Sequence, residues 1–196
     1  MKTNYNNKIP NDFFNNVLKI STSTIISALV VAIALPIITK IFSASILGKY
    51  QLLISIITIF GVISCLKYEM AIVLPEKDKI ASNVLILCLL ALSSFCLILL
   101  LIFYLTNGNL LKILNAENLI DTFWLIPVGV FFFGLFEIIK YSLLRKKLFN
   151  HFSKARVYQV LSTQSLMIIF GLIKPSFISL FLAFISGHFI STMAFL

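Results

Sequence analysis

Six blocks of continuous apolar sequence, each about 20 residues long, constrain the fold of this chain more than any other feature. The hydrocarbon core of a bilayer is about 30 Å thick, and a helix needs about 20 apolar residues to cross it. Strands of a membrane β-barrel would instead alternate apolar and polar residues over about ten positions. The sequence therefore predicts an all-α polytopic membrane protein. After a polar tail at 1–12, one six-helix lobe is expected at 13–196, with spans at 17–40, 50–74, 83–105, 122–144, 157–174 and 176–196.

Composition and charge placement support a membrane protein and argue against a nucleic-acid partner. Hydrophobic residues make up 60% of the chain and charged residues only 12%, whereas soluble domains are about 25% charged. The net charge of +9 lies mainly between the blocks. If the N-terminus is inside, ten Lys and Arg residues lie in inner segments, against four in outer loops: Lys40, Lys49, Lys112 and Lys174. The positive-inside rule then predicts a cytoplasmic N-terminus.

The second block carries two charges that a spanning helix does not need. Lys67 and Glu69 interrupt an apolar run from Leu52 to Leu74, which ends at Pro75 and a hydrophilic loop. An ionised side chain at a helix centre costs about 2.5–3.5 kcal/mol on insertion, and less near the helix ends. Either these side chains extend to the nearby interface, or they face a hydrated interior with a function.

The same stretch carries a family resemblance. A basic residue, Lys67, is followed by Tyr68, Glu69 and then x-Ala-Ile-Val-Leu-Pro at the end of the second block. This pattern resembles the polysaccharide-unit flippases, the O-antigen and capsule translocases of the multidrug/oligosaccharidyl-lipid/polysaccharide exporter superfamily, where Arg is more frequent at the basic position. The resemblance implies a bacterial cytoplasmic-membrane protein and the N-terminal lobe of a MATE-like two-lobe transporter. It implies flipping of an oligosaccharide repeat unit on undecaprenyl diphosphate by alternating access.

Candidate cavity residues lie on one face of the first block. Lys19, Ser23 and Ser27 are spaced by four residues and share that face of a helix. The two serines either bond to their own backbone carbonyls or line a hydrated cavity. A diphosphate substrate requires cations that face the cavity, and Lys19, Lys67 and Lys140 are the expected ones.

Later blocks add further candidates. Glu137 and Lys140 are i,i+3 neighbours in the inner half of the fourth span and can pair, either as an interfacial ion pair or as charges that face the lobe interior. Gln159 begins a polar face of the fifth span that reaches Thr163. The two glutamates, Glu69 and Glu137, are expected to keep the neighbouring lysines charged and oriented.

The sequence predicts neither an enzyme nor a cofactor. It contains no nucleotide-binding loop, no zinc-protease motif and no nucleophile elbow, so catalytic, cofactor and metal residues are all expected to be absent. A drug/cation antiporter lobe remains an alternative function. A membrane-embedded polymerase or acyltransferase is disfavoured because the outer loops are short and lack His and Arg.

A truncated, non-transporting remnant is a further alternative. The sixth block ends at Leu196 without a basic flank, so the sequence predicts truncation at the C-terminus. The expected partners are a lipid-linked oligosaccharide, membrane lipids, and a second lobe or a second copy of the chain. The small residues Ala183, Gly187 and Ser191 offer either an association surface or contacts within the lobe.

Overall fold

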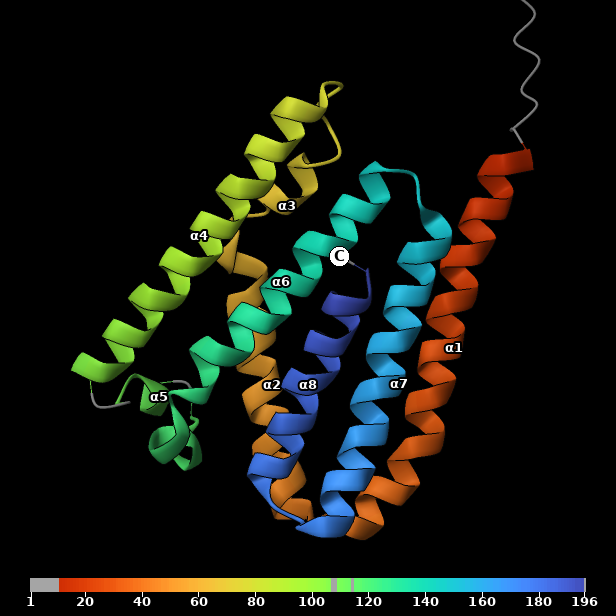
Figure 1. The fold of residues 1–196 in the computed structure, drawn as a ribbon. Helices are drawn as coiled ribbons and strands as arrows, with labels where there is room; N and C mark the ends of the chain where they lie inside the picture. The colour runs from red at the N-terminus through yellow and green to blue at the C-terminus, as the bar shows by residue number, and fades with distance from the viewer. Residues whose placement is uncertain (1–10, 107–108, 114, 196) are drawn as a thin grey trace, which may run out of the picture.

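The computed structural model describes residues 11–106, 109–113 and 115–195 and contains no strand among them (Figure 1). Six helices are long and apolar enough to cross a membrane. They are α1 (Asn11–Ile41), α2 (Ala44–Ser64), α4 (Asp78–Leu105), α6 (Leu125–Arg145), α7 (Phe149–Ile173) and α8 (Phe177–Phe195). The shorter elements are α3 (Tyr68–Ala71), α5 (Leu110–Ile113) and the 3-10 helix η1 (Glu117–Thr122). The prediction of an all-α polytopic protein is confirmed, while most of the predicted tail, residues 1–10, lies outside the described residues.

The spanning helices form two packed groups that share α8 (Figure 1). In the first group α7 lies between α1 and α8, and Ile38, Met167 and Leu180 form its buried core. In the second group α6 packs against α2, α4 and α8. Its core is larger, and each of the four helices contributes to it, for example at Ile57, Leu92, Val130 and Phe181.

Small residues on α8 let it approach α7 closely. Gly187 lies directly against Thr163, where a Cβ atom would come within 2.9 Å of the Thr163 Cα atom. One turn further on, the Ser191 hydroxyl donates a hydrogen bond to the Ala155 carbonyl across the same contact, at 2.8 Å. Ala183 is fully buried. The small-residue line of α8 therefore serves contacts within the lobe, which answers the alternative left open by the sequence.

The second spanning helix ends earlier than the sequence predicts. The expected span at 50–74 was wrong from residue 65 onward, because α2 ends at Ser64. Leu66 and Lys67 both adopt left-handed backbone angles, with φ of 48° and 63°. This conformation costs roughly 1–2 kcal/mol per residue for a side chain with a Cβ atom and cannot continue a right-handed helix. Lys67 therefore lies in the turn after α2 and Glu69 in the short helix α3, so neither residue lies within the spanning helix.

Four of the spanning helices begin before their predicted starts. α1 and α2 each begin six residues early, at Asn11 and Ala44, α4 begins five residues early, at Asp78, and α7 begins eight residues early, at Phe149. All four added stretches carry charged residues. A helix can continue past the hydrocarbon core into the headgroup region, where polar residues are tolerated. A search for apolar runs therefore misses the polar ends of a long helix.

Arg145, at the end of α6, holds the segment between α3 and α4. Its guanidinium donates to the carbonyls of Pro75 and Ile72, the latter at 3.4 Å, and to the Asp78 carboxylate at 2.9 Å. The positive-inside rule accounts for a basic residue here only as a topology signal. In the structure, Arg145 also fixes the loop that follows the broken second span.

Replacing Arg145 is therefore expected to loosen this loop. Arg145→Gln removes hydrogen bonds from a charged donor, each worth about 1.5–3 kcal/mol, and leaves the two carbonyls without that partner. Hydrogen–deuterium exchange should show faster uptake between residues 72 and 80 than in the unmodified chain. Lys147→Gln, which changes an exposed cation two residues away, serves as the control. Equal uptake in both variants would contradict a fixing role for Arg145.

Candidate functional site

A cavity of about 410 Å³ lies between α1, α6, α7 and α8 and gathers polar side chains from all four helices. We call it the polar cavity. Phe133 and Phe136 of α6 form part of its apolar wall. Its polar lining consists of Thr24, Ser27, Glu137, Lys140, Arg156, Gln159 and His188.

The charges of the polar cavity do not balance. Lys140 Nζ lies 2.5 Å from Glu137 Oε1, so the i,i+3 pairing predicted from the sequence is confirmed. The two side chains are 20% and 26% exposed, which places the ion pair largely within the protein. Arg156 has no carboxylate at ion-pair distance among the described residues. The lining therefore carries two cations and one anion, an excess of one positive charge.

His188 and Gln159 connect α8 to α7 at the wall of the cavity. His188 is buried, and its Nδ1 lies 2.9 Å from the Phe184 carbonyl oxygen. Because a carbonyl only accepts, Nδ1 carries the proton and Nε2 is left as an acceptor. Gln159 Nε2 donates to the Thr163 hydroxyl at 3.3 Å and lies nearly equidistant from the two ring nitrogens of His188, 3.4 Å from Nε2 and 3.5 Å from Nδ1. The amide of Gln159 is thereby oriented at the contact between α7 and α8.

The two serines predicted for the cavity wall differ in their hydrogen bonding. The Ser23 hydroxyl donates to the Ile20 carbonyl at 2.7 Å, so the backbone-bonded alternative holds for Ser23. The Ser27 hydroxyl is buried and has no partner among the described residues. A buried polar group without a partner costs roughly 1–3 kcal/mol. Since Ser27 lines the polar cavity, rotation of its side chain would bring the hydroxyl to a polar ligand there.

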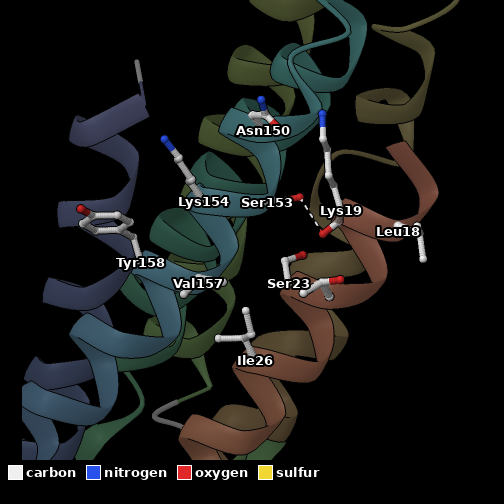
Figure 2. Close-up of a pocket in the computed structure, with 10 residues that line it drawn as sticks. Leu18, Lys19, Ser23, Ile26, Asn150, Ser153, Lys154, Val157 and Tyr158 are labelled. Carbon is white, nitrogen blue, oxygen red and sulfur yellow. Dashed lines mark hydrogen bonds between the residues drawn. The ribbon is translucent and has the colours of Figure 1, made fainter. Parts of the chain in front are cut away.

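A separate groove of about 550 Å³ runs between α1 and α7 (Figure 2). It shares no lining residue with the polar cavity. Lys19 and Ser23 line it, and Figure 2 shows Asn150 and Lys154 of α7 near its Lys19 end. The Ser153 hydroxyl donates to the Lys19 carbonyl at 3.1 Å and joins the two helices beside the groove.

The residues that carry the family resemblance lie in a third place. Glu69 is only 5% exposed, and its Oε1 lies 3.9 Å from Lys67 Nζ. The other carboxylate oxygen is buried without a partner among the described residues. The Lys67 side chain is 51% exposed, and Tyr68 is also exposed. These three residues line neither the polar cavity nor the α1–α7 groove.

The structure thus brings together only part of the predicted set. Ser27, Glu137, Lys140 and Gln159 meet in the polar cavity, with Arg156 and His188 beside them. Neither Arg156 nor His188 was named as a candidate from the sequence. One available signal was the spacing of Arg156 and Gln159, which lie three residues apart and therefore on one helix face.

Comparison with other proteins gives no independent guide to function. No protein-family model, no curated protein and no solved structure matches this chain. Within the described residues, no group of three or more His, Cys, Asp or Glu side chains is placed to hold a metal ion. The functional argument therefore rests on the polar cavity and on the six membrane-spanning helices.

Proposed function

We propose that this chain is a transporter lobe that helps to flip undecaprenyl-diphosphate-linked oligosaccharide repeat units across the bacterial cytoplasmic membrane. The observation that carries the proposal is the positive charge excess in the polar cavity. A diphosphate is anionic and is bound best by charge-assisted hydrogen bonds from guanidinium and ammonium groups. Arg156 supplies the guanidinium, and Lys140 supplies an ammonium group already oriented by Glu137.

The neutral groups of the polar cavity suit the sugar part of such a substrate. Ser27 offers an unpartnered hydroxyl, and Gln159 offers an amide held in place by Thr163 and His188. Hydroxyl and amide groups can both donate to and accept from sugar hydroxyls. In this proposal, alternating access requires a second lobe or a second copy of the chain, which moves against this one around the site.

Binding of the substrate to the purified chain tests the proposal directly. In nanodiscs, the chain should bind an undecaprenyl-diphosphate-linked oligosaccharide in preference to neutral phosphatidylcholine, as measured by native mass spectrometry. Arg156→Gln should weaken this binding by about tenfold to a hundredfold, since a charged hydrogen bond is worth about 1.5–3 kcal/mol.

The matched control is Lys174→Gln, which removes an exposed cation from the other end of α7 and should bind like the unmodified chain. Equal binding by both variants would show that the polar cavity is not the binding site for the substrate. Translocation itself is tested separately, by restoration of surface glycan in a flippase-deleted host that also contains a second lobe.

The proposed membrane orientation has its own test. With a cytoplasmic N-terminus, the segment containing Asn109 is outside and Asn150 is inside. Single cysteines introduced at these two positions should react oppositely with a membrane-impermeant maleimide in intact cells. Cysteine at position 109 should label, and cysteine at position 150 should label only after lysis. Labelling at position 150 in intact cells would show that the chain has the opposite orientation.

A drug/cation antiporter is the second candidate function. The observation that favours it is the buried Glu69 carboxylate, one oxygen of which has no partner among the described residues. An organic cation or a metal cation could supply that partner, and Lys67 only partly neutralises the group at 3.9 Å. Efflux of a cationic dye that is lost in Glu69→Gln, together with absent binding of the lipid-linked oligosaccharide, would favour this function over flipping.

A further inference from the structure

A cavity of about 480 Å³ lies between α4, α6 and α8 and shares no lining residue with the polar cavity or the α1–α7 groove. Most of its wall is aliphatic, with Leu85 and Leu89 from α4 and Ile138, Ile139 and Leu143 from α6. We call it the aliphatic cavity. In a membrane-spanning protein, an aliphatic space of this kind suits a hydrocarbon chain, because the surrounding medium supplies such chains.

The polar groups of the aliphatic cavity lie at the ends of its helices. Lys146 caps the C-terminus of α6, and the lining then follows α6 through Leu143 and Ile139 toward the middle of the span. The side chain of Lys146 is exposed, so its ammonium group can reach the headgroup region. The cavity thus has a cationic rim and an aliphatic interior.

Thr192 of α8 adds an unpaired donor to this cavity. It is only 3% exposed, and its hydroxyl has no partner among the described residues. Helical threonines commonly donate to the carbonyl four residues earlier, as Thr106 does to Ile102 at 2.8 Å. A buried hydroxyl without such a bond is costly unless a ligand or another group accepts from it. Because Thr192 lines the aliphatic cavity, rotation of its side chain would turn the hydroxyl toward an acceptor there.

We propose that the aliphatic cavity binds one anionic glycerophospholipid. An acyl chain fills the aliphatic interior, an ester carbonyl accepts a hydrogen bond from Thr192, and the phosphate contacts Lys146. The order of phosphate, ester and acyl chain in such a lipid follows the direction from Lys146 along α6 into the cavity. A lysine near the membrane surface favours anionic over neutral lipid. The ester carbonyl distinguishes this lipid from a polyprenyl diphosphate, which has none.

Lipid-dependent stability provides the first test. The detergent-solubilised chain is titrated with palmitoyl-oleoyl phosphatidylglycerol or with the matching phosphatidylcholine, and thermal unfolding is followed. Phosphatidylglycerol should raise the unfolding temperature at lower concentration than phosphatidylcholine. Lys146→Ala should reduce the apparent affinity for phosphatidylglycerol about fivefold, which corresponds to the usual contribution of one lysine near an anionic surface. Lys147→Ala is the matched control and should leave the affinity unchanged, because Lys147 does not line the cavity.

The hydroxyl and the aliphatic interior have separate variants. Thr192→Val keeps the side-chain shape but removes the hydrogen-bond donor. It should therefore weaken the binding of both phospholipids to the same degree. Ile139→Trp fills the cavity and should abolish stabilisation by either lipid. The proposal would be overturned if Lys146→Ala and Lys147→Ala had equal affinity for phosphatidylglycerol. It would also be overturned if lipid stabilised Ile139→Trp as much as the unmodified chain.

A measurement on the unmodified chain does not depend on these variants folding. A phosphatidylglycerol analogue with a photoreactive diazirine in its acyl chain is incorporated into nanodiscs and illuminated. The crosslinked peptides should come from α4 around Leu85 and from α6 around Ile139. Crosslinks spread evenly over the exposed apolar face of α1 would instead indicate contact with bulk lipid and would contradict a specific lipid site.

Discussion

Gly187→Ala is expected to destabilise the lobe by about 1–3 kcal/mol, the usual cost of overpacking a well-packed contact. An added Cβ atom would lie 2.0 Å from the Thr163 hydroxyl oxygen and 2.9 Å from the Thr163 Cα atom. The hydroxyl can rotate away, but the Cα atom belongs to the backbone of α7, so one helix must move. That movement would also disturb the bond from Gln159 to Thr163 at the wall of the polar cavity.

The measurement is unfolding by sodium dodecyl sulfate in mixed micelles, followed by circular dichroism. Gly48→Ala is the matched control, because nothing lies within 4 Å of the corresponding Cβ position. Gly48 lies in α2, and within a helix alanine is favoured over glycine by about 0.5–1 kcal/mol. The control should therefore be neutral or slightly stabilising. If both variants unfold alike, the close approach of α7 and α8 at Gly187 contributes nothing to stability.

Glu137→Gln is expected to cost a comparable 1–3 kcal/mol or so, because it leaves Lys140 as an unpaired cation that is only 20% exposed. Breaking a fully buried ion pair by removing one partner costs about 3–5 kcal/mol, and partial exposure reduces that value here. The 2.5 Å contact between Lys140 Nζ and Glu137 Oε1 identifies the interaction that is lost.

The double variant Glu137→Gln/Lys140→Met distinguishes the lost pair from a general loss of packing. Removing both charges avoids an isolated cation, so the double variant should recover most of the stability lost in Glu137→Gln. The free energies of unfolding of the unmodified chain, Glu137→Gln, Lys140→Met and the double variant form a thermodynamic cycle. This cycle measures the coupling energy between Glu137 and Lys140. A coupling energy near zero would show that the two side chains act independently despite their contact.

The number and class of the spanning helices could be predicted from sequence, because bilayer thickness sets the length of apolar run that each helix needs and such runs can be counted. The pairing of Glu137 with Lys140 was also predictable, since a helix places i and i+3 side chains side by side. The end of α2 at Ser64 was not predictable by the same reasoning. The chain remains apolar there, and the left-handed pair Leu66 and Lys67 contains neither glycine nor proline to mark the break.

The composition of the polar cavity depended on tertiary packing and was therefore only partly predictable. Arg156 lies in a basic run that the positive-inside rule explains without any site. His188 joins the cavity only because α8 packs against α6 and α7, where its Nε2 meets Gln159. Helical periodicity specifies which residues share a face but does not specify which helices those faces meet.

The turn after α2 has a consequence for how deeply the protein sits in its membrane. Leu66 is 68% exposed and Leu74 is 80% exposed, at the two ends of a segment too short to cross a bilayer. Apolar side chains on such a segment gain free energy by entering the boundary between headgroups and acyl chains, while Lys67 remains toward water. Because Arg145 joins this segment to α6, we expect its immersion to fix the depth of α6 in the membrane. The segment from Leu66 to Leu74 would then hold Glu137 and Lys140 at a constant depth.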